Sequence, residues 1–215
     1  MDFTHSFVHF NAPYVLICGS YQDNRVIDKL CTILGNELAK QNIGLISGGG
    51  RPAIKIAESM DKTLTDMGYD EPFKIVTIYR KKRKEDDLKT KRIGCNLFVE
   101  KDIHDIRDYL FSKSKVSIVI GGATKTKQEI LLAHERKISI VPVAMSGGAA
   151  FSIWEQYLRY GRRHINKDLF SQLNNKNPFI ASNAVIDISK ELIRHDGKDT
   201  GHVNTTGVQN PLTVH

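Results

Sequence analysis

A glycine pair between an apolar run and a helical pattern is the feature of this sequence best suited to chemistry. The run from Ile118 to Ile120 is β-branched, Gly121 and Gly122 follow it, and a helical pattern begins near Lys125. A strand that turns directly into a helix gathers backbone N–H groups at the positive end of the helix dipole, which favours a phosphate or another anion. We therefore expect a nucleotide-like ligand at this turn.

Charged side chains flank the glycine pair on both sides in sequence. Arg107 lies in the preceding helical pattern, Lys125 lies in the loop that opens the next helix, and Glu129 follows one turn later. From the residues alone, Glu129 is either an acid stabilised by the helix dipole or a carboxylate aimed at ribose hydroxyls. Arg107 is likewise either a solvated helix arginine or a ligand of phosphate, and both alternatives stay open at this point.

Two earlier apolar runs also end in glycine-bearing turns. Ligands of open α/β sheets bind beyond the carboxyl ends of the strands, so these turns join the candidate site. The sequence has neither the Walker pattern nor the G-x-G-x-x-G spacing, which argues against an ordinary ATPase or Rossmann dehydrogenase. The candidate ligand-binding residues of these turns are Gly19, Ser20 and Tyr21 after the first run and Ser47, Gly48 and Gly49 after the second.

The elements that must position these turns alternate regularly along the chain. Short apolar segments, several of them continuous apolar runs, indicate strands at 14–20, 43–50, 73–79, 96–100, 115–122 and 138–144, and helical patterns cover 24–41, 52–68, 102–113 and 125–136. Apolar runs of this kind suit strands that are buried on both faces of a parallel sheet. We predict a doubly wound, mostly parallel, Rossmann-like sheet with helices on both faces and a C-terminal helical layer.

The sequence also indicates how the chain is divided. We expect one nucleotide-binding domain over residues 13–195, preceded by an N-terminal extension at 1–12. The stretch 196–215 has few apolar residues and no periodicity, which is typical of a flexible tail.

The formal net charge of +7 brings anionic ligands into consideration, and much of the excess lies between Arg80 and Arg92. A nucleic-acid site would interleave aromatic residues with the basic ones, and this run has none, which argues against a nucleic-acid partner. The run is either a solvated loop or a source of second-tier contacts that close over the ligand or steer it. Those second-tier candidates are Arg80, Lys81, Arg83 and Arg92.

Cysteine usage and hydropathy indicate where the protein works. Three cysteines, Cys18, Cys31 and Cys95, have neither paired nor metal-ligand spacing, and the first two lie in apolar patterns. No apolar run approaches the length of about 18 residues that is needed to span a bilayer. We expect a reduced, cytoplasmic protein with no metal and no membrane partner.

Residues 13 to 160 resemble the SLOG superfamily, which is related to the lysine-decarboxylase-like nucleotide hydrolases. Those enzymes carry an arginine on the helix before this strand and then P-G-G-x-G-T-x-x-E. Arg107 matches the arginine, Gly121 and Gly122 the glycine pair, and Thr126 with Glu129 the T-x-x-E, with one extra residue in the loop. Isoleucine replaces the proline, and the glycine directly before the threonine is lost, so the loop departs from the hydrolytic pattern.

Within the superfamily the sequence is most similar to the sirtuin- and TIR-associated SLOG (STALD) domain of Thoeris-type anti-phage systems. That resemblance implies a non-enzymatic sensor for a cyclic ADP-ribose isomer made by a TIR-type NAD-cleaving enzyme, with no cofactor. It places Arg107 and Lys125 on the phosphates and Glu129 near a ribose. It also implies a homo-oligomer that acts through a separate or fused effector domain.

The alternative is a nucleoside-monophosphate N-glycosidase of the lysine-decarboxylase-like kind. In that interpretation Glu129 supports an oxocarbenium-like transition state and Arg107 binds the phosphate.

Overall fold

The computed structural model describes residues 12–80, 93–160 and 165–195. Some of the predicted features lie outside these ranges. They are residues 1–11 of the predicted N-terminal extension, the predicted tail at 196–215, and the second-tier candidates Lys81, Arg83 and Arg92. The strands of the described part are β1 (Tyr14–Ser20), β2 (Gly44–Ser47), β3 (Ile75–Arg80), β4 (Cys95–Val99), β5 (Ser114–Gly121) and β6 (Ser139–Val143).

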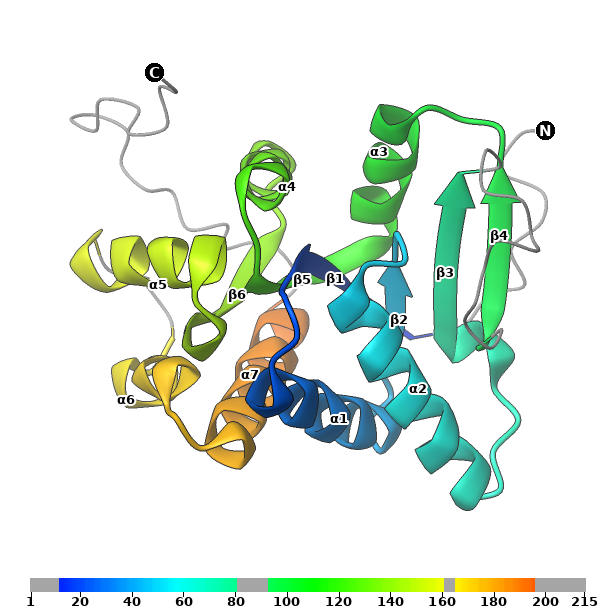
Figure 1. The fold of residues 1–215 in the computed structure, drawn as a ribbon, viewed down its shortest axis with the longest axis horizontal. Coiled ribbons are helices and arrows are strands. Elements are labelled where there is room, and N and C mark those ends of the chain that lie inside the picture. Colours follow the sequence, from blue (N-terminus) through cyan, green and yellow to red (C-terminus); the bar gives the residue numbers. More distant parts are fainter. Residues whose placement is uncertain (1–11, 81–92, 161–164, 196–215) are drawn as a thin grey trace.

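These strands form one sheet in the order β4-β3-β2-β1-β5-β6, and every neighbouring pair within it is parallel (Figure 1). The helices are α1 (Arg25–Ala39), α2 (Arg51–Asp66), α3 (Ile103–Lys113), α4 (Thr124–Glu135), α5 (Gly148–Tyr160), α6 (Lys167–Ser171) and α7 (Pro178–Arg194). Short 3₁₀ turns occupy Pro72–Lys74, Ala144–Ser146 and Gln172–Asn174.

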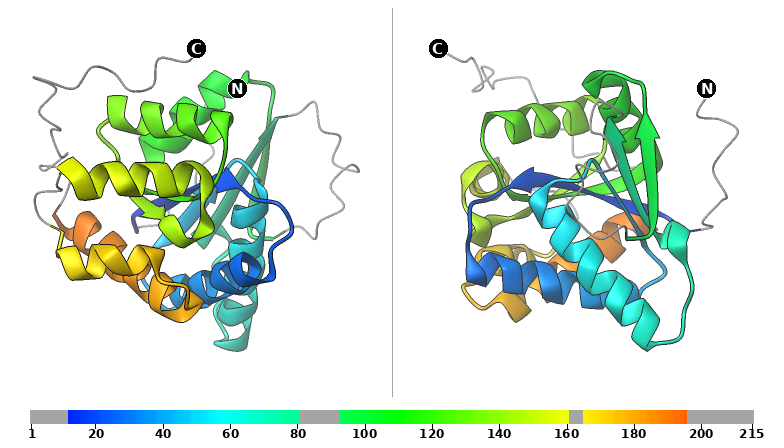
Figure 2. Two further views of the ribbon diagram at one scale, coloured as in Figure 1. Left: turned by 60° about the vertical axis from the view of Figure 1, so that its left-hand side comes forward. Right: turned by 45° about the vertical axis from the view of Figure 1, so that its right-hand side comes forward.

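Helices cover both faces of the sheet. α1, α2 and α7 lie on one face, α3 and α4 lie on the other, and α5 packs on β5 and β6 (Figures 1 and 2). The predicted doubly wound, Rossmann-like fold with a C-terminal helical layer is therefore confirmed.

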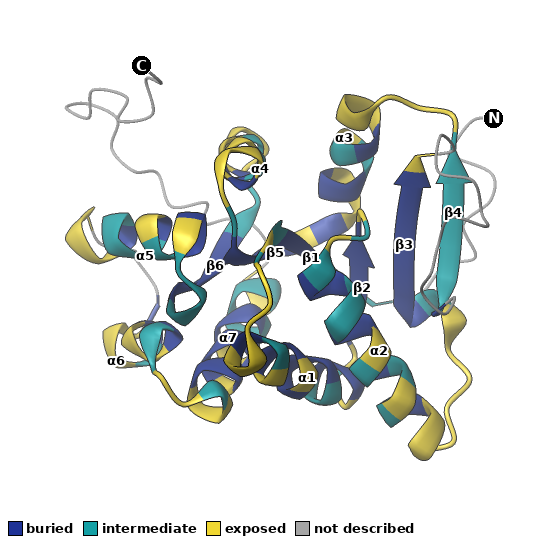
Figure 3. Ribbon diagram, viewed as in Figure 1, coloured by how far each residue is buried: buried dark blue, intermediate teal, exposed yellow. Residues whose placement is uncertain are grey.

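The central strands owe their position to their apolar composition. In β5 every residue except Lys115 is buried, and β2 is buried throughout, as the dark strands in the middle of Figure 3 show. A strand that is buried on both faces removes apolar side chains from water on each side, which stabilises a parallel sheet between two helical layers. The core accordingly lies on both sides of β1, β2 and β5.

Local signals fix where the helices begin. The Asn24 side chain accepts hydrogen bonds from the N–H groups of Val26 and Ile27, and Asp102 caps α3 in the same way. Proline occupies the first turn of α2 and of α7, where its missing N–H breaks no helical hydrogen bond. These caps explain why the predicted helix starts near 24 and 102 agree with the structure.

The chain reverses its direction of winding between β1 and β5. From β1 it proceeds to β2 and β3 on one side, and β5 and β6 lie on the other side. At such a switch point the connections diverge to opposite faces of the sheet and leave a crevice at the carboxyl ends of the strands. The turns after β1 and β5 meet at this crevice because Gly19 pairs with Ile120 and Ser20 with Gly121 in the β1–β5 register.

No helix in the described ranges combines the length and the apolar character that a membrane crossing requires.

Candidate functional site

The glycine turn after β5 has a backbone that only glycine adopts easily. Gly121 and Gly122 have φ values of 61° and 94°, and a Cβ added to Gly122 would lie 2.4 Å from the Cβ and Oγ1 of Thr126. The Gly122 N–H donates to the Ser20 carbonyl at 2.7 Å, and the Gly121 N–H donates to Ser146 Oγ at 2.6 Å. Both amides are thus engaged within the protein, and the turn acts as a scaffold for the start of α4.

No side chain caps the first turn of α4. The helix begins after Ala123 without a side-chain hydrogen bond and without an acidic residue in its first turn. Its first N–H groups have no partner inside the helix, and they lie at the positive end of the dipole. Lys125, in the same turn, is exposed, whereas Thr126 is 3% exposed and packs under the glycine turn. An anion at this end of α4 meets both the backbone donors and the Lys125 charge.

Arg107 of α3 and Glu129 of α4 form an ion pair beside this turn. Arg107 Nη2 lies 3.7 Å from Glu129 Oε1, and the two side chains are only 16% and 23% exposed. Burial raises the pKa of the Glu129 carboxyl, and Arg107 together with a hydrogen bond from the Gly19 backbone opposes that rise. Arg107 is therefore a half-buried partner of a carboxylate and not a solvated helix arginine.

The end of β1 lies next to this ion pair. Cys18 is buried, and burial, helped by the Glu129 charge, raises the pKa of its thiol far above the ordinary value. Its sulfur accepts a hydrogen bond from Ser117 Oγ at 3.5 Å. A thiol that stays protonated is a poor nucleophile, so Cys18 contributes packing, as its apolar sequence context predicted.

The turn after β2 is divided between interior and surface. Ser47 is 1% exposed, its Oγ lies 3.5 Å from Thr77 Oγ1, and it accepts a hydrogen bond from the Gly49 N–H at 3.3 Å. Gly49 has a φ of 78°, and an added Cβ would meet the Tyr79 ring at 2.4 Å. Gly48 is exposed. Ser47 therefore stabilises the turn from the interior, whereas Gly48 lies at the surface near the crevice.

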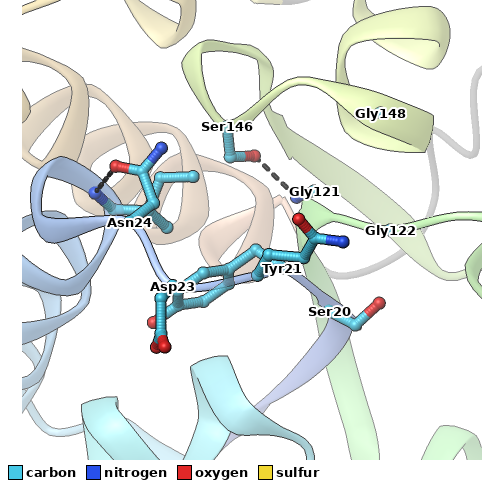
Figure 4. Close-up of a pocket in the computed structure, with 10 residues that line it drawn as sticks. Ser20, Tyr21, Asp23, Asn24, Gly121, Gly122, Ser146 and Gly148 are labelled. Atoms are coloured by element: carbon cyan, nitrogen blue, oxygen red, sulfur yellow. Dashed lines mark hydrogen bonds between the residues drawn. The ribbon is translucent and has the colours of Figure 1, made fainter.

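A pocket of about 330 Å³ opens on the α1 side of the same crevice. In Figure 4 the Tyr21 side chain lies among its lining residues, and a hydrogen bond joins Ser146 to the glycine turn. We call it the Tyr21 pocket, and its lining consists of Ser20, Tyr21, Gln22, Asp23, Asn24, Ile27, Gly121, Gly122, Ser146 and Gly148.

One wall of the Tyr21 pocket is held by Arg51, the first residue of α2. Arg51 forms ion pairs with Asp23 and, at 3.3 Å, with Asp28 Oδ2, and its guanidinium lies 5.1 Å from the centre of the Tyr21 ring. The Tyr21 hydroxyl donates to Asp28 Oδ1 at 2.6 Å, and this bond, with Arg51, lowers the pKa of Asp28. The cluster fixes the turn between β1 and α1.

Of the second-tier candidates, only Arg80 lies within the described part of the chain. It is the last residue of β3 and is exposed. Across the described ranges no group of three or more His, Cys, Asp or Glu side chains is arranged to hold a metal ion.

Comparison with known proteins gives a likeness of fold. No protein-family profile and no curated protein matches the sequence. Among solved structures, the structural genomics target TM1055 aligns with a TM-score of 0.53 and 17% identity over 74% of this chain and 88% of its own. DNA processing protein A from Helicobacter pylori, which binds single-stranded DNA, aligns with a TM-score of 0.51 and 16% identity over 76% and 81%. These neighbours share the doubly wound parallel α/β fold of this chain, and the likeness extends no further than the fold.

Proposed function

We propose that this protein binds a phosphorylated nucleoside at the carboxyl ends of β1 and β5. The observation that carries the proposal is the half-buried pair of Arg107 and Glu129 beside the uncapped first turn of α4. A helix N-terminus supplies donors for a phosphate, and a neighbouring arginine and carboxylate supply complementary groups for the phosphate and a sugar.

The loose geometry of the ion pair supports this role. Its N–O distance of 3.7 Å is longer than the ~2.7–2.9 Å of a strong charge-assisted hydrogen bond. Arg107 therefore does not commit its donors to a close bidentate contact with Glu129. A phosphate that approaches α4 gains the Arg107 guanidinium, while Glu129 remains available to accept a hydrogen bond from a ribose hydroxyl.

The finer form of the proposal is a sensor for a cyclic ADP-ribose-type signal that couples binding to self-association or to an effector in anti-phage defence. Such a ligand carries two phosphates, and the site offers Arg107, Lys125 and the α4 amides for them. The altered loop before Thr126 favours holding the ligand over cleaving it. The sequence resemblance to Thoeris-type domains supports the choice of ligand.

Calorimetry with cyclic ADP-ribose isomers tests this proposal. We expect at least one isomer to bind at micromolar concentrations and Arg107→Ala to weaken binding roughly tenfold to hundredfold, as loss of a charged hydrogen bond does. Arg159→Ala, at an exposed arginine in the last turn of α5, is the matched control and keeps wild-type affinity. Absence of binding by every isomer, or equal affinity in wild type and Arg107→Ala, contradicts the proposal.

One observation favours the alternative, N-glycosidase, function. Burial raises the pKa of the Glu129 carboxyl in a crevice beside Arg107, and carboxyl groups with a perturbed pKa cluster at active sites. In that case incubation with AMP releases free base, Glu129→Gln abolishes the release, and Glu135→Gln, at an exposed residue of the same helix, does not. If wild-type protein releases no base from AMP or other nucleoside monophosphates, the alternative is excluded.

A further inference from the structure

We propose that the Tyr21 pocket is the nucleoside subsite of the nucleotide whose phosphate lies at α4, with the base stacked on the Tyr21 ring. This inference rests on the proposed function and adds to it where the uncharged part of the ligand binds. It therefore assigns recognition of the base to the α1 side of the crevice and recognition of the phosphate to the α4 side.

The pocket and the Arg107 pair are joined through adjacent residues of both central strands. Gly122 lines the pocket, and the next residue, Ala123, is the N-cap of α4. Ser20 also lines the pocket, and the preceding residue, Gly19, is hydrogen-bonded through its backbone to Glu129. A ligand with its phosphate on α4 thus needs to cross only the edge of the glycine turn to reach the pocket.

The size of the Tyr21 pocket and the chemistry of its lining suit a neutral group. Its volume of about 330 Å³ lies near the lower end of the ~300–1,000 Å³ that small-molecule sites span. No lysine or arginine lines it, and Asp23 is its only charged residue, so it does not attract a phosphate. Hydroxyl and amide groups that donate or accept hydrogen bonds come from Ser20, Gln22 and Asn24, whereas the Ser146 hydroxyl already accepts from the Gly121 N–H and donates to the Val143 carbonyl.

The Tyr21 ring is a pre-ordered platform. Its hydroxyl donates to Asp28, and the Arg51 guanidinium lies over the ring, so the side chain has little freedom to lose when a base binds. Asn24 is similarly fixed, because its side-chain oxygen caps α1, which leaves the amide NH₂ for a ligand. A base in the pocket therefore finds an aromatic face and a fixed donor beside it.

The test compares two ligands that share a phosphate and differ in the base, AMP and ribose 5-phosphate, by calorimetry. We expect wild type to bind AMP more tightly than ribose 5-phosphate. Tyr21→Leu should lower the ratio of the two affinities roughly tenfold to hundredfold, the range that loss of a base–aromatic stack gives. Ribose 5-phosphate affinity should not change in Tyr21→Leu. Tyr21→Phe, which keeps the ring, should keep the preference for AMP.

A second variant covers the case in which Tyr21→Leu fails to fold. Gln22 is an exposed residue of the pocket lining, and Gln22→Trp should obstruct the pocket and reduce AMP affinity alone. Asn42→Trp, at an exposed residue just before β2 and so at the amino ends of the strands, is the control and should bind both ligands as wild type does.

The outcomes separate this inference from the proposed function. If wild type binds ribose 5-phosphate but shows no preference for AMP, or keeps its preference in the folded Tyr21 and Gln22 variants, the subsite is wrong and the phosphate site stands. If Arg107→Ala leaves the affinity for both ligands unchanged, or neither ligand binds, the proposed function itself is wrong and the subsite is rejected with it.

Discussion

The Glu129 carboxylate lies in surroundings that disfavour its own charge. Its side chain is 23% exposed, and the loss of hydration outweighs the opposing effects of Arg107 and the Gly19 backbone on its pKa. A protein gains no stability from such a group at neutral pH. Its presence is understandable if a ligand supplies the hydrogen bonds that the folded protein does not.

This residue makes the stability of the protein depend on pH in a defined direction. Because the folded-state pKa of Glu129 lies above its ordinary value of 4.5, the folded protein holds this proton over a range in which the unfolded chain has lost it. The free energy of unfolding therefore falls as the pH rises through that range. We therefore expect the free energy of unfolding of Glu129→Gln, relative to that of wild type, to increase as the pH rises from about 4 to about 7.5.

Urea denaturation of both proteins at the two pH values measures this difference. Glu135→Gln, at an exposed carboxylate in the same helix, should show no such gain. A difference between wild type and Glu129→Gln that is independent of pH would mean that Glu129 is not held with a raised pKa.

For individual residues, a motif in the sequence indicates some neighbours, and only the fold shows others. A known loop pattern joins Arg107 to Glu129, and the structure brings the two together. Arg51 and Asp28 belong to different helices and share no motif, so no sequence pattern indicates their contact. Asp23 joins them only because the β1–α1 turn carries it to the start of α2.

The start of α5 rests directly on the glycine turn. The Ala149 N–H donates to the Gly122 carbonyl at 2.9 Å, and a Cβ added to Gly148 would lie 2.3 Å from that same oxygen. The turn after β6 therefore fixes the position of the turn after β5. Correct placement of the α4 N-terminus depends on a helix that contributes none of the proposed phosphate ligands.

Two neighbouring glycines allow this dependence to be measured. Gly147 and Gly148 have φ values of 72° and 58°, and Gly147 has a ψ of −163°, so alanine at either costs about 1–3 kcal/mol for a backbone that L residues rarely adopt. A Cβ at Gly147 meets nothing within 4 Å, whereas one at Gly148 collides with backbone. We expect Gly148→Ala to destabilise the protein by about 2 kcal/mol more than Gly147→Ala does, within the range of overpacked sites.

Chemical denaturation of both alanine variants gives the comparison. Equal losses of stability would show that α5 tolerates a shift away from the glycine turn.

The elements themselves are largely predictable from the sequence, and their ends are not. The sequence patterns place all six strands of the described part, and the signal is clearest for β2 and β5, because strands buried on both faces leave a continuous apolar run. The second strand is predicted over 43–50 but ends at Ser47, since the glycines after it already form the turn into α2. The third is predicted from 73 but begins at Ile75, because Pro72–Lys74 forms a 3₁₀ turn.

On the scale of the whole molecule, the site depends on the order of the strands. β1 lies between β2 and β5, so helices from both faces of the sheet converge on one crevice. α3 and α4 bring Arg107 and Glu129 from one face, and the β1–α1 turn brings Tyr21 from the other. Sequence patterns indicate the parallel sheet, but the position of the switch point is known only from the strand order.

A sensor must also couple ligand binding to a change in its assembly or in a partner protein. A ligand shifts an assembly equilibrium only if it binds one assembly more tightly than another. We expect sedimentation velocity to show a change in the mass of the protein at saturating cyclic ADP-ribose isomer, and no change in Arg107→Ala at the same concentration. An unchanged mass in wild type that demonstrably binds the ligand would remove self-association from the proposal.

A crystal structure of the protein with a cyclic ADP-ribose isomer would show the proposed site in a single experiment. We expect a phosphate in contact with the Arg107 guanidinium and the first N–H groups of α4, and a base against the Tyr21 ring. A ligand bound elsewhere with this crevice empty, or a phosphate that makes no contact with Arg107 or α4, would contradict the proposal.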